Sequence, residues 1–316
     1  MRKVPRFLHL SSAAFAVIFT GCWSGPGQRT SPEGPVNYRN DRITFSNSNV
    51  SDLGNSKKAV NSNGNESKDV MKRFVVNLPA GFEQPSSDVG RKLLKEYGAV
   101  FVARGGITAP TKVIFRDGAE VTAFQMSIKT SAASIGGLSM VLQASAMEGL
   151  RAAISQANSK GLTITPRGGD SAKRTYEETI GLWESRVEPA LVHWVGKGRL
   201  TRAEADRIRA MSTYEQVEEV LRLEDQGIWF AKDLSKSIIY SVAPPGTSQH
   251  LSMLAFDVKE HDNVEVRRIL NENGWFQTVV SDLPHFTFLG VKEKELSDLG
   301  LKKRSDDGRT YWVPDI

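Results

Sequence analysis

The chain contains a single cysteine, Cys22, among its 316 residues, which excludes an intramolecular disulfide. Long hydrophobic runs are absent as well. The most apolar stretch, FLHLSSAAFAVIF at residues 7–19, contains His9 and two serines. Its 13 residues fall well short of the roughly 20 apolar residues that a membrane-spanning helix needs. Neither a disulfide framework nor a membrane-embedded fold is therefore expected.

The chain also lacks a strong excess of charge. Its formal net charge is +5, and Arg2, Lys3 and Arg6 supply three of those charges. Without residues 1–21 a net charge of about +2 remains, which is too small to argue for nucleic acid as a partner. The composition, 40% hydrophobic and 24% charged, is that of a globular protein with room for one full core and a small annex.

The N-terminus has the pattern of an export signal. Residues 1–21 combine a basic start, an apolar stretch and small residues before a cleavage point. Phe19-Thr20-Gly21-Cys22 resembles a bacterial lipobox, with Phe19 at a position where Leu, Val or Ile is usual. The resemblance implies a lipid on Cys22 that tethers an exported cell-envelope protein to a membrane face; the alternative is plain secretion with an incidental cysteine. We expect the protein outside the cytoplasm in either case.

Residues 22–70 are predicted to form a disordered tether. Of the 47 residues from 24 to 70, 24 are Ser, Asn, Gly or Pro, and few are large and apolar, so burial cannot offset the entropy of ordering. Residues 71–135 read as a small α+β annex in which we find no catalytic chemistry. Its expected elements are strands at 73–78, 99–103, 112–115 and 121–126, a turn at Arg116-Asp117-Gly118 and a helix at 88–97.

Residues 136–316 form the predicted main domain. Helices and strands mix there without a regular βαβ rhythm, which favours an α+β fold over a doubly wound sheet. Expected helices are 142–157, one that begins after Asp170 and continues through Val187, one capped by Thr201 and Glu204, and one that ends at Gly274. Expected strands are 162–165, 237–242, 255–258 and 275–280, with a further strand around Phe286 and Phe288.

Histidine is scarce: the chain has five, and His9 leaves with the signal. His193 precedes a tryptophan in a predicted helix and His261 lies in a charged turn, so both are expected to be structural or solvated. The other two, His250 and His285, each have a carboxylate nearby. Asp257 follows His250 by seven residues, and Asp282 precedes His285 by three.

Catalytic zinc takes three nitrogen or oxygen ligands and keeps a fourth position for water. His250, Asp257 and His285 would supply those ligands, and Asp282 would remain free to take a proton from the water. Phe286 and Phe288 alternate with His285, which suggests that His285 faces outward. Spacing alone also fits two hydrogen-bonded structural His–Asp pairs.

Two motifs resemble those of a known enzyme family. Ser248-x-His250-x-x-Met253-x-Ala255-x-Asp257 resembles the SxHxxGxAxD signature of VanY-like zinc D-alanyl-D-alanine carboxypeptidases, and Asp282-x-x-His285 resembles their ExxH element. The resemblance covers residues 136–292. It implies the hedgehog/DD-peptidase fold, an antiparallel sheet with flanking helices, and a zinc ion (Zn2+) on His250, Asp257 and His285. It implies as substrate the peptidoglycan stem peptide.

The same resemblance implies roles for further residues. Asp282 takes the place of the catalytic glutamate and Ser248 lines the substrate site. Arg174 matches the family's substrate-binding arginine, with Arg167 as the competing candidate. The sequence departs from the family pattern where Met253 replaces a glycine and where Asp282 is one methylene shorter. Three alternatives stay open: a cross-link endopeptidase, a peptidoglycan-binding lipoprotein with weak catalysis, and a partner-docking role for residues 71–135.

Overall fold

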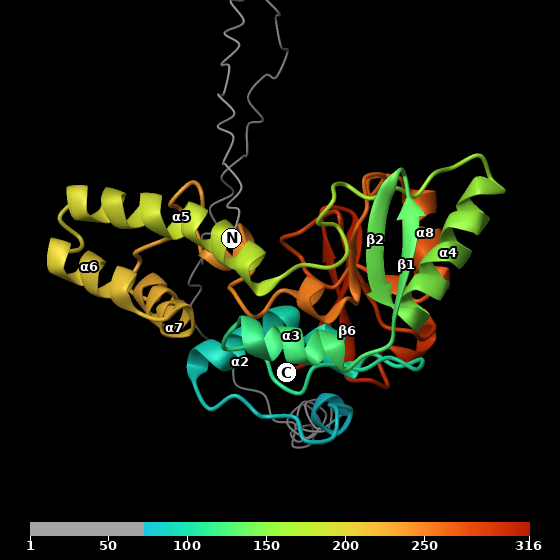
Figure 1. Ribbon diagram of the computed structural model, residues 1–316, viewed down its shortest axis with the longest axis horizontal. Helices are drawn as coiled ribbons and strands as arrows, with labels where there is room; N and C mark the ends of the chain where they lie inside the picture. Colours follow the sequence, from blue (N-terminus) through green and yellow to red (C-terminus); the bar gives the residue numbers. More distant parts are fainter. Residues whose placement is uncertain (1–72) are drawn as a thin grey trace, which may run out of the picture. The chain divides into compact units, whose positions relative to one another are not determined.

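The computed structural model describes residues 73–316, and Figure 1 shows their arrangement. The signal at 1–21, the lipidation position Cys22 and the tether at 22–70 all lie outside the described residues. In the described part, no helix combines the length and the apolar character needed to cross a membrane.

The fold is mixed α+β, as predicted, with three small antiparallel sheets. The first pairs β1 (Thr130–Ile135) with β2 (Leu138–Gln143), and the last pairs β6 (Leu301–Asp306) with β7 (Arg309–Pro314). The central sheet has the order β3-β5-β4, formed by Ala255–Asp257, His285–Phe288 and Trp275–Phe276. His285, the histidine of the Asp282-x-x-His285 motif, is therefore the first residue of the middle strand of this sheet.

Helix α4 (Ala144–Asn158) packs against the β1–β2 hairpin and against α8 (Val264–Glu272), and α8 leads into the central sheet through β4 (Figure 1). Helices α5 (Tyr176–Gly196), α6 (Arg202–Ala210) and α7 (Thr213–Glu224) pack in series and form what we call the helical arm (Figure 1). Each begins with a reciprocal cap, Thr175 with Glu178, Thr201 with Glu204 and Ser212 with Glu215. Such caps satisfy the first backbone N–H groups of a helix, which lack partners within it.

Residues 73–135 share a hydrophobic core with the rest of the described chain. Leu93 of α2 (Asp88–Tyr97) and Phe101 of the 3₁₀ helix η1 (Gly98–Val102) belong to the same buried cluster as Leu150 and Phe288. Backbone contacts reinforce this packing, since the N–H of Phe115 donates to the carbonyl of Gly246 at 3.0 Å. Gly246 has a φ of +82°, and a Cβ there would lie 2.1 Å from the carbonyl oxygen of Phe115, so only glycine fits.

Several predicted strands in residues 73–135 are wrong. Residues 73–76 are helical, 99–102 belong to η1, and 112–115 make only one bridge, from Lys112 to Glu83. Residues 121–126 belong to helix α3 (Gly118–Met126). Here Asp117 is an N-cap rather than a turn residue, because its carboxylate accepts the N–H of Glu120 at 2.8 Å.

In the main region two predicted strands are absent, the strand predicted at 275–280 is confirmed only for Trp275–Phe276, and one helix starts later than predicted. Residues 162–165 form no strand, and 237–242 contain the 3₁₀ helix η2 (Ile238–Tyr240). The buried carboxylate of Glu224 accepts the N–H of Ile238 at 2.6 Å and so replaces a strand partner. Helix α5 begins after Thr175 rather than after Asp170, whose carboxylate pairs with Arg174 instead. Helices α2, α4, α6 and α8 and strands β3 and β5 are confirmed.

Candidate metal centre

The two motifs meet through the register of the central sheet. Asp257, the last residue of β3, lies directly opposite His285, the first residue of β5. His250 lies in the short 3₁₀ helix η3 (Gln249–Ser252), which turns back into β3. Residues far apart in sequence are thereby brought to one end of the sheet, and the motif resemblance had implied this grouping.

Met253 makes the turn between η3 and β3 in a left-handed conformation, with φ 55° and ψ 33°. A glycine adopts this region at no steric cost, whereas other residues are strained there by about 1 kcal/mol or more. Met253 therefore keeps the backbone that the motif's glycine would favour. Its side chain is buried in the core.

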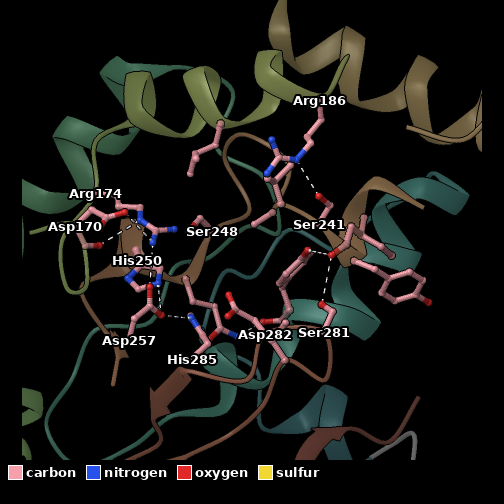
Figure 2. A pocket seen from close by; sticks show the side chains of 18 of the residues that line it. Asp170, Arg174, Arg186, Ser241, Ser248, His250, Asp257, Ser281, Asp282 and His285 are labelled. Atoms are coloured by element: carbon pink, nitrogen blue, oxygen red, sulfur yellow. Dashed lines mark hydrogen bonds and ion pairs between the residues drawn. The ribbon is translucent and has the colours of Figure 1, made fainter. Parts of the chain in front are cut away.

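His250, Asp257 and His285 form a buried triad (Figure 2). The Nε2 atom of His250 and the Nδ1 atom of His285 each lie 3.2 Å from the same oxygen, Oδ1 of Asp257. The side chains expose only 2%, 9% and 5% of their surface, in the order of the chain. One ligand atom from each residue lies within 4.8 Å of the other two, so the triad can hold a metal ion.

The outer nitrogens of both histidines are bound to acceptors. Nδ1 of His250 lies 2.9 Å from the backbone carbonyl of Ala172, which can only accept, so this nitrogen carries the proton. Nε2 of His285 lies 2.9 Å from Oε1 of Gln249. The amide of Gln249 is oriented by its own Nε2, which donates to the carbonyl of Tyr97 at 2.9 Å. In their neutral forms both rings therefore carry their lone pairs on the inner nitrogens.

With these tautomers three acceptors converge, because the proton of His285 is on Nε2 and not on Nδ1, whose 3.2 Å contact with Oδ1 of Asp257 would otherwise be a hydrogen bond. His250 Nε2 is buried and has no hydrogen-bond partner, although Asp257 Oδ1 is close to it. Burial lowers the pKa of His250 and so favours its neutral ring. The two imidazole lone pairs and the carboxylate oxygen form a donor set that suits a metal ion. The outer ring nitrogens are protonated and bound to acceptors, as is usual for histidines that bind a metal.

Arg174 contacts the other oxygen of Asp257. Its Nη2 lies 3.0 Å from Oδ2 of Asp257 and 3.2 Å from a carboxylate oxygen of Asp170, and its side chain is only 14% exposed. Gln125 holds the segment in place by donating to the carbonyls of Arg174, at 2.9 Å, and of Leu251, at 3.1 Å. The guanidinium thus orients the Asp257 carboxylate so that Oδ1 faces both histidines.

The triad opens onto a pocket of about 440 Å³ (Figure 2). Ser248, Asp282 and Arg167 line it, as does Arg174, so the structure brings every predicted site residue other than Cys22 to one place. Asp282 is held next to His285 by a turn, since the N–H of His285 donates to the Asp282 carbonyl at 3.2 Å. Within the described chain no hydrogen bond reaches the Asp282 carboxylate, whereas Arg167 is exposed and bonds to Asp257 through its backbone N–H.

The expectation that His285 faces outward is wrong, because all four residues of β5 are buried. β5 is the middle strand of its sheet, and both faces are covered. Sequence reasoning also missed Gln249, Tyr97 and Arg186, which line the pocket. Gln249 stands between two motif residues and so offered a signal; Tyr97 and Arg186 lie in ordinary amphipathic helices and offered none. His193 and His261 are outside the pocket lining, as expected.

Comparisons of the chain with protein-family models, with curated proteins and with solved structures found no match in any of the three.

Gln249 provides a direct test of the metal centre. Replacing it with leucine should lower zinc affinity by about 10- to 100-fold, because His285 loses the acceptor that fixes its tautomer. Competition with a chromogenic zinc chelator measures this without any activity. Gln156→Leu is the matched control, since Gln156 is a half-buried glutamine on α4 that bonds to Glu272 and lies outside the pocket lining. Equal zinc affinity in the wild type and the Gln249 variant would contradict the tautomer assignment.

Proposed function

We propose that the triad binds zinc and that the protein is a zinc-dependent peptidase that hydrolyses the D-Ala-D-Ala end of peptidoglycan stem peptides. The observation that carries the proposal is the convergence of two imidazole lone pairs and one carboxylate oxygen at 3.2 Å, with both outer nitrogens protonated. The motif positions that resemble those of the zinc carboxypeptidases supply all three ligand atoms. The hedgehog/DD-peptidase fold remains part of this proposal.

The donor set suits zinc. Two imidazoles and one carboxylate are typical protein ligands of catalytic zinc, which leaves a fourth position free. Softer ions prefer thiolates, and the only cysteine in the chain lies outside the described residues. Magnesium and calcium prefer all-oxygen sites, which this triad does not offer. The pocket on one side of the triad gives space for a substrate carbonyl.

When bound, zinc would polarise the scissile carbonyl and lower the pKa of a water molecule toward about 7. The protein's own residues would then handle the protons and the orientation. Asp282 lines the pocket beside His285 and would accept a proton from the attacking water, then return it to the leaving amine. Arg174 would keep the Asp257 carboxylate oriented, and Ser248 would line the substrate channel.

The proposal fits the expectations for the N-terminus. An export signal at 1–21 and a lipid on Cys22 would place the pocket in the cell envelope, where stem peptides are found. The Asp282 position also favours a second candidate, a peptidoglycan-binding lipoprotein of weak activity. A shorter side chain shifts the carboxylate, and a misplacement of about 1 Å can cost on the order of a hundredfold in rate.

The deciding experiment pairs metal analysis with a peptide digest. Purified protein is expected to contain one zinc ion per chain and to release D-alanine from a stem pentapeptide. Chelation should stop the release, and added zinc should restore it. Binding of the pentapeptide with no release would favour the binding lipoprotein, and cleavage only of cross-linked dimers would favour the endopeptidase. Absence of zinc binding would overturn the proposal.

A further inference from the structure

Three arginines line the pocket, Arg167, Arg174 and Arg186, and they differ in what holds their guanidinium groups. Arg174 is held by the carboxylates of Asp170 and Asp257, so its charge is already balanced. Arg186 is different. In the described part of the chain, no carboxylate lies within ion-pair distance of it. The arginine that the family resemblance assigns to the substrate is therefore engaged. In the described chain the guanidinium groups of Arg186 and of the exposed Arg167 are free of carboxylates, and of these two only that of Arg186 is held by side-chain hydrogen bonds.

Neutral groups fix Arg186 in place. Its Nε donates to Oγ of Ser241 at 2.9 Å, and its Nη1 donates to Oγ of Ser185 at 2.9 Å. Hydroxyl groups orient a guanidinium without neutralising it. The side chain is partly buried. Its guanidinium group keeps its full positive charge, and it has further N–H donors besides the two that bind the serine hydroxyls. A planar guanidinium that is oriented in advance binds a carboxylate well, because little conformational entropy is lost on binding.

Figure 2 shows Arg186 reaching from helix α5 on the side of the pocket away from His250, Asp257 and His285. Ser241 lies beside it, just after η2, and Leu182 of the same helix also lines the pocket. A substrate whose reacting carbonyl lies at the triad would therefore extend toward Arg186. The unpaired cation is positioned to bind an anionic group of that substrate.

We propose that Arg186, oriented by Ser241, binds the C-terminal carboxylate of the peptide substrate and so selects free peptide ends over cross-linked ones. The inference rests on the proposed peptidase function and deepens it. It differs from the family-based expectation, in which Arg174 or Arg167 carries this role. Arg174 becomes a positioning residue for the metal ligand Asp257, and Arg186 a specificity residue for the substrate.

The test compares KM and kcat on three stem pentapeptides: the free acid, its C-terminal carboxamide, and a peptide with only its internal carboxylate amidated. Arg186→Gln should raise KM for the free acid by about 10- to 100-fold, the usual effect of losing a charge-assisted hydrogen bond. The variant should lose the wild-type preference for the acid over the carboxamide. Ser241→Ala should show the same trend with a smaller shift.

Arg209→Gln is the matched control. Arg209 lies on α6 in the helical arm and pairs with Glu188 and Asp206, so its loss removes the same charge without touching the pocket. Arg186→Lys keeps the positive charge but not the guanidinium. An unchanged unfolding temperature in this variant would show that the fold tolerates changes at position 186, which separates a folding defect from a binding defect. The proposed subsite would be overturned if Arg186→Gln kept the wild-type preference for the free acid over the carboxamide. It would also be overturned if the effect of Arg186→Gln on KM depended on the internal carboxylate and not on the C-terminal one. Absence of D-alanine release by the zinc-loaded wild type would instead overturn the proposed function first.

Discussion

Replacing Asp257 with asparagine is expected to abolish zinc binding and to leave the metal-free protein at least as stable as the wild type. Oδ1 of Asp257 lies 3.2 Å from two inner ring nitrogens that carry lone pairs. An amide NH₂ at that position can donate one hydrogen bond to each ring, and the amide oxygen can still accept from Arg174. Each new hydrogen bond contributes about 1 kcal/mol. The zinc site, in contrast, loses its only anionic ligand.

Thermal unfolding with and without zinc measures both effects. The wild type should gain about 4 kcal/mol when free zinc exceeds its Kd a thousandfold, and the variant should gain nothing. Asp170→Asn is the control, because it removes the other carboxylate that contacts Arg174 and leaves the triad intact. A clear loss of stability in metal-free Asp257→Asn would indicate a proton-bridged structural pair rather than a metal centre.

The capped helices could be predicted from sequence because their signals are local. Thr201 and Glu204 lie three residues apart and satisfy each other's backbone N–H groups, so the start of α6 needs no tertiary information. The apolar runs at 99–103 and 237–242 could not be assigned this way. Both contain a 3₁₀ helix, fully buried in the first case and with Ile238 and Ile239 buried in the second, and a short buried run has no period that separates helix from strand.

The triad itself was accessible from the motif resemblance, whereas spacing alone, with a carboxylate close in sequence to each histidine, fitted two separate His–Asp pairs as well. The residues that hold the triad in place could not be predicted in this way. Arg174 reaches Asp257 across 83 residues, and Gln249 is oriented by the carbonyl of Tyr97 from a helix 152 residues earlier. Such contacts depend on tertiary packing and leave no local pattern. The same holds for residues 73–135, where no chemistry was predicted and which nevertheless supply Tyr97 and Gln125 to the site.

The second large effect concerns Asp282. Replacing it with asparagine should lower kcat by about 10²- to 10⁴-fold, because the amide can no longer accept the proton from the attacking water. Zinc binding should not change, since Asp282 is not one of the three residues whose ligand atoms converge. Release of D-alanine gives the rate, and chelator competition gives the affinity.

Asp282→Glu tests whether reach limits the reaction. The turn that places the Asp282 carbonyl 3.2 Å from the N–H of His285 fixes the backbone, so one added methylene moves the carboxylate further into the pocket. A glutamate that acts as a base should restore part of the activity lost in the asparagine variant. A rate in Asp282→Asn equal to that of the wild type would exclude Asp282 as the base. No residue of the described chain donates a hydrogen bond to the Asp282 carboxylate. The position of this carboxylate therefore depends on the length of its own side chain, whereas the triad side chains are held by their hydrogen-bond partners.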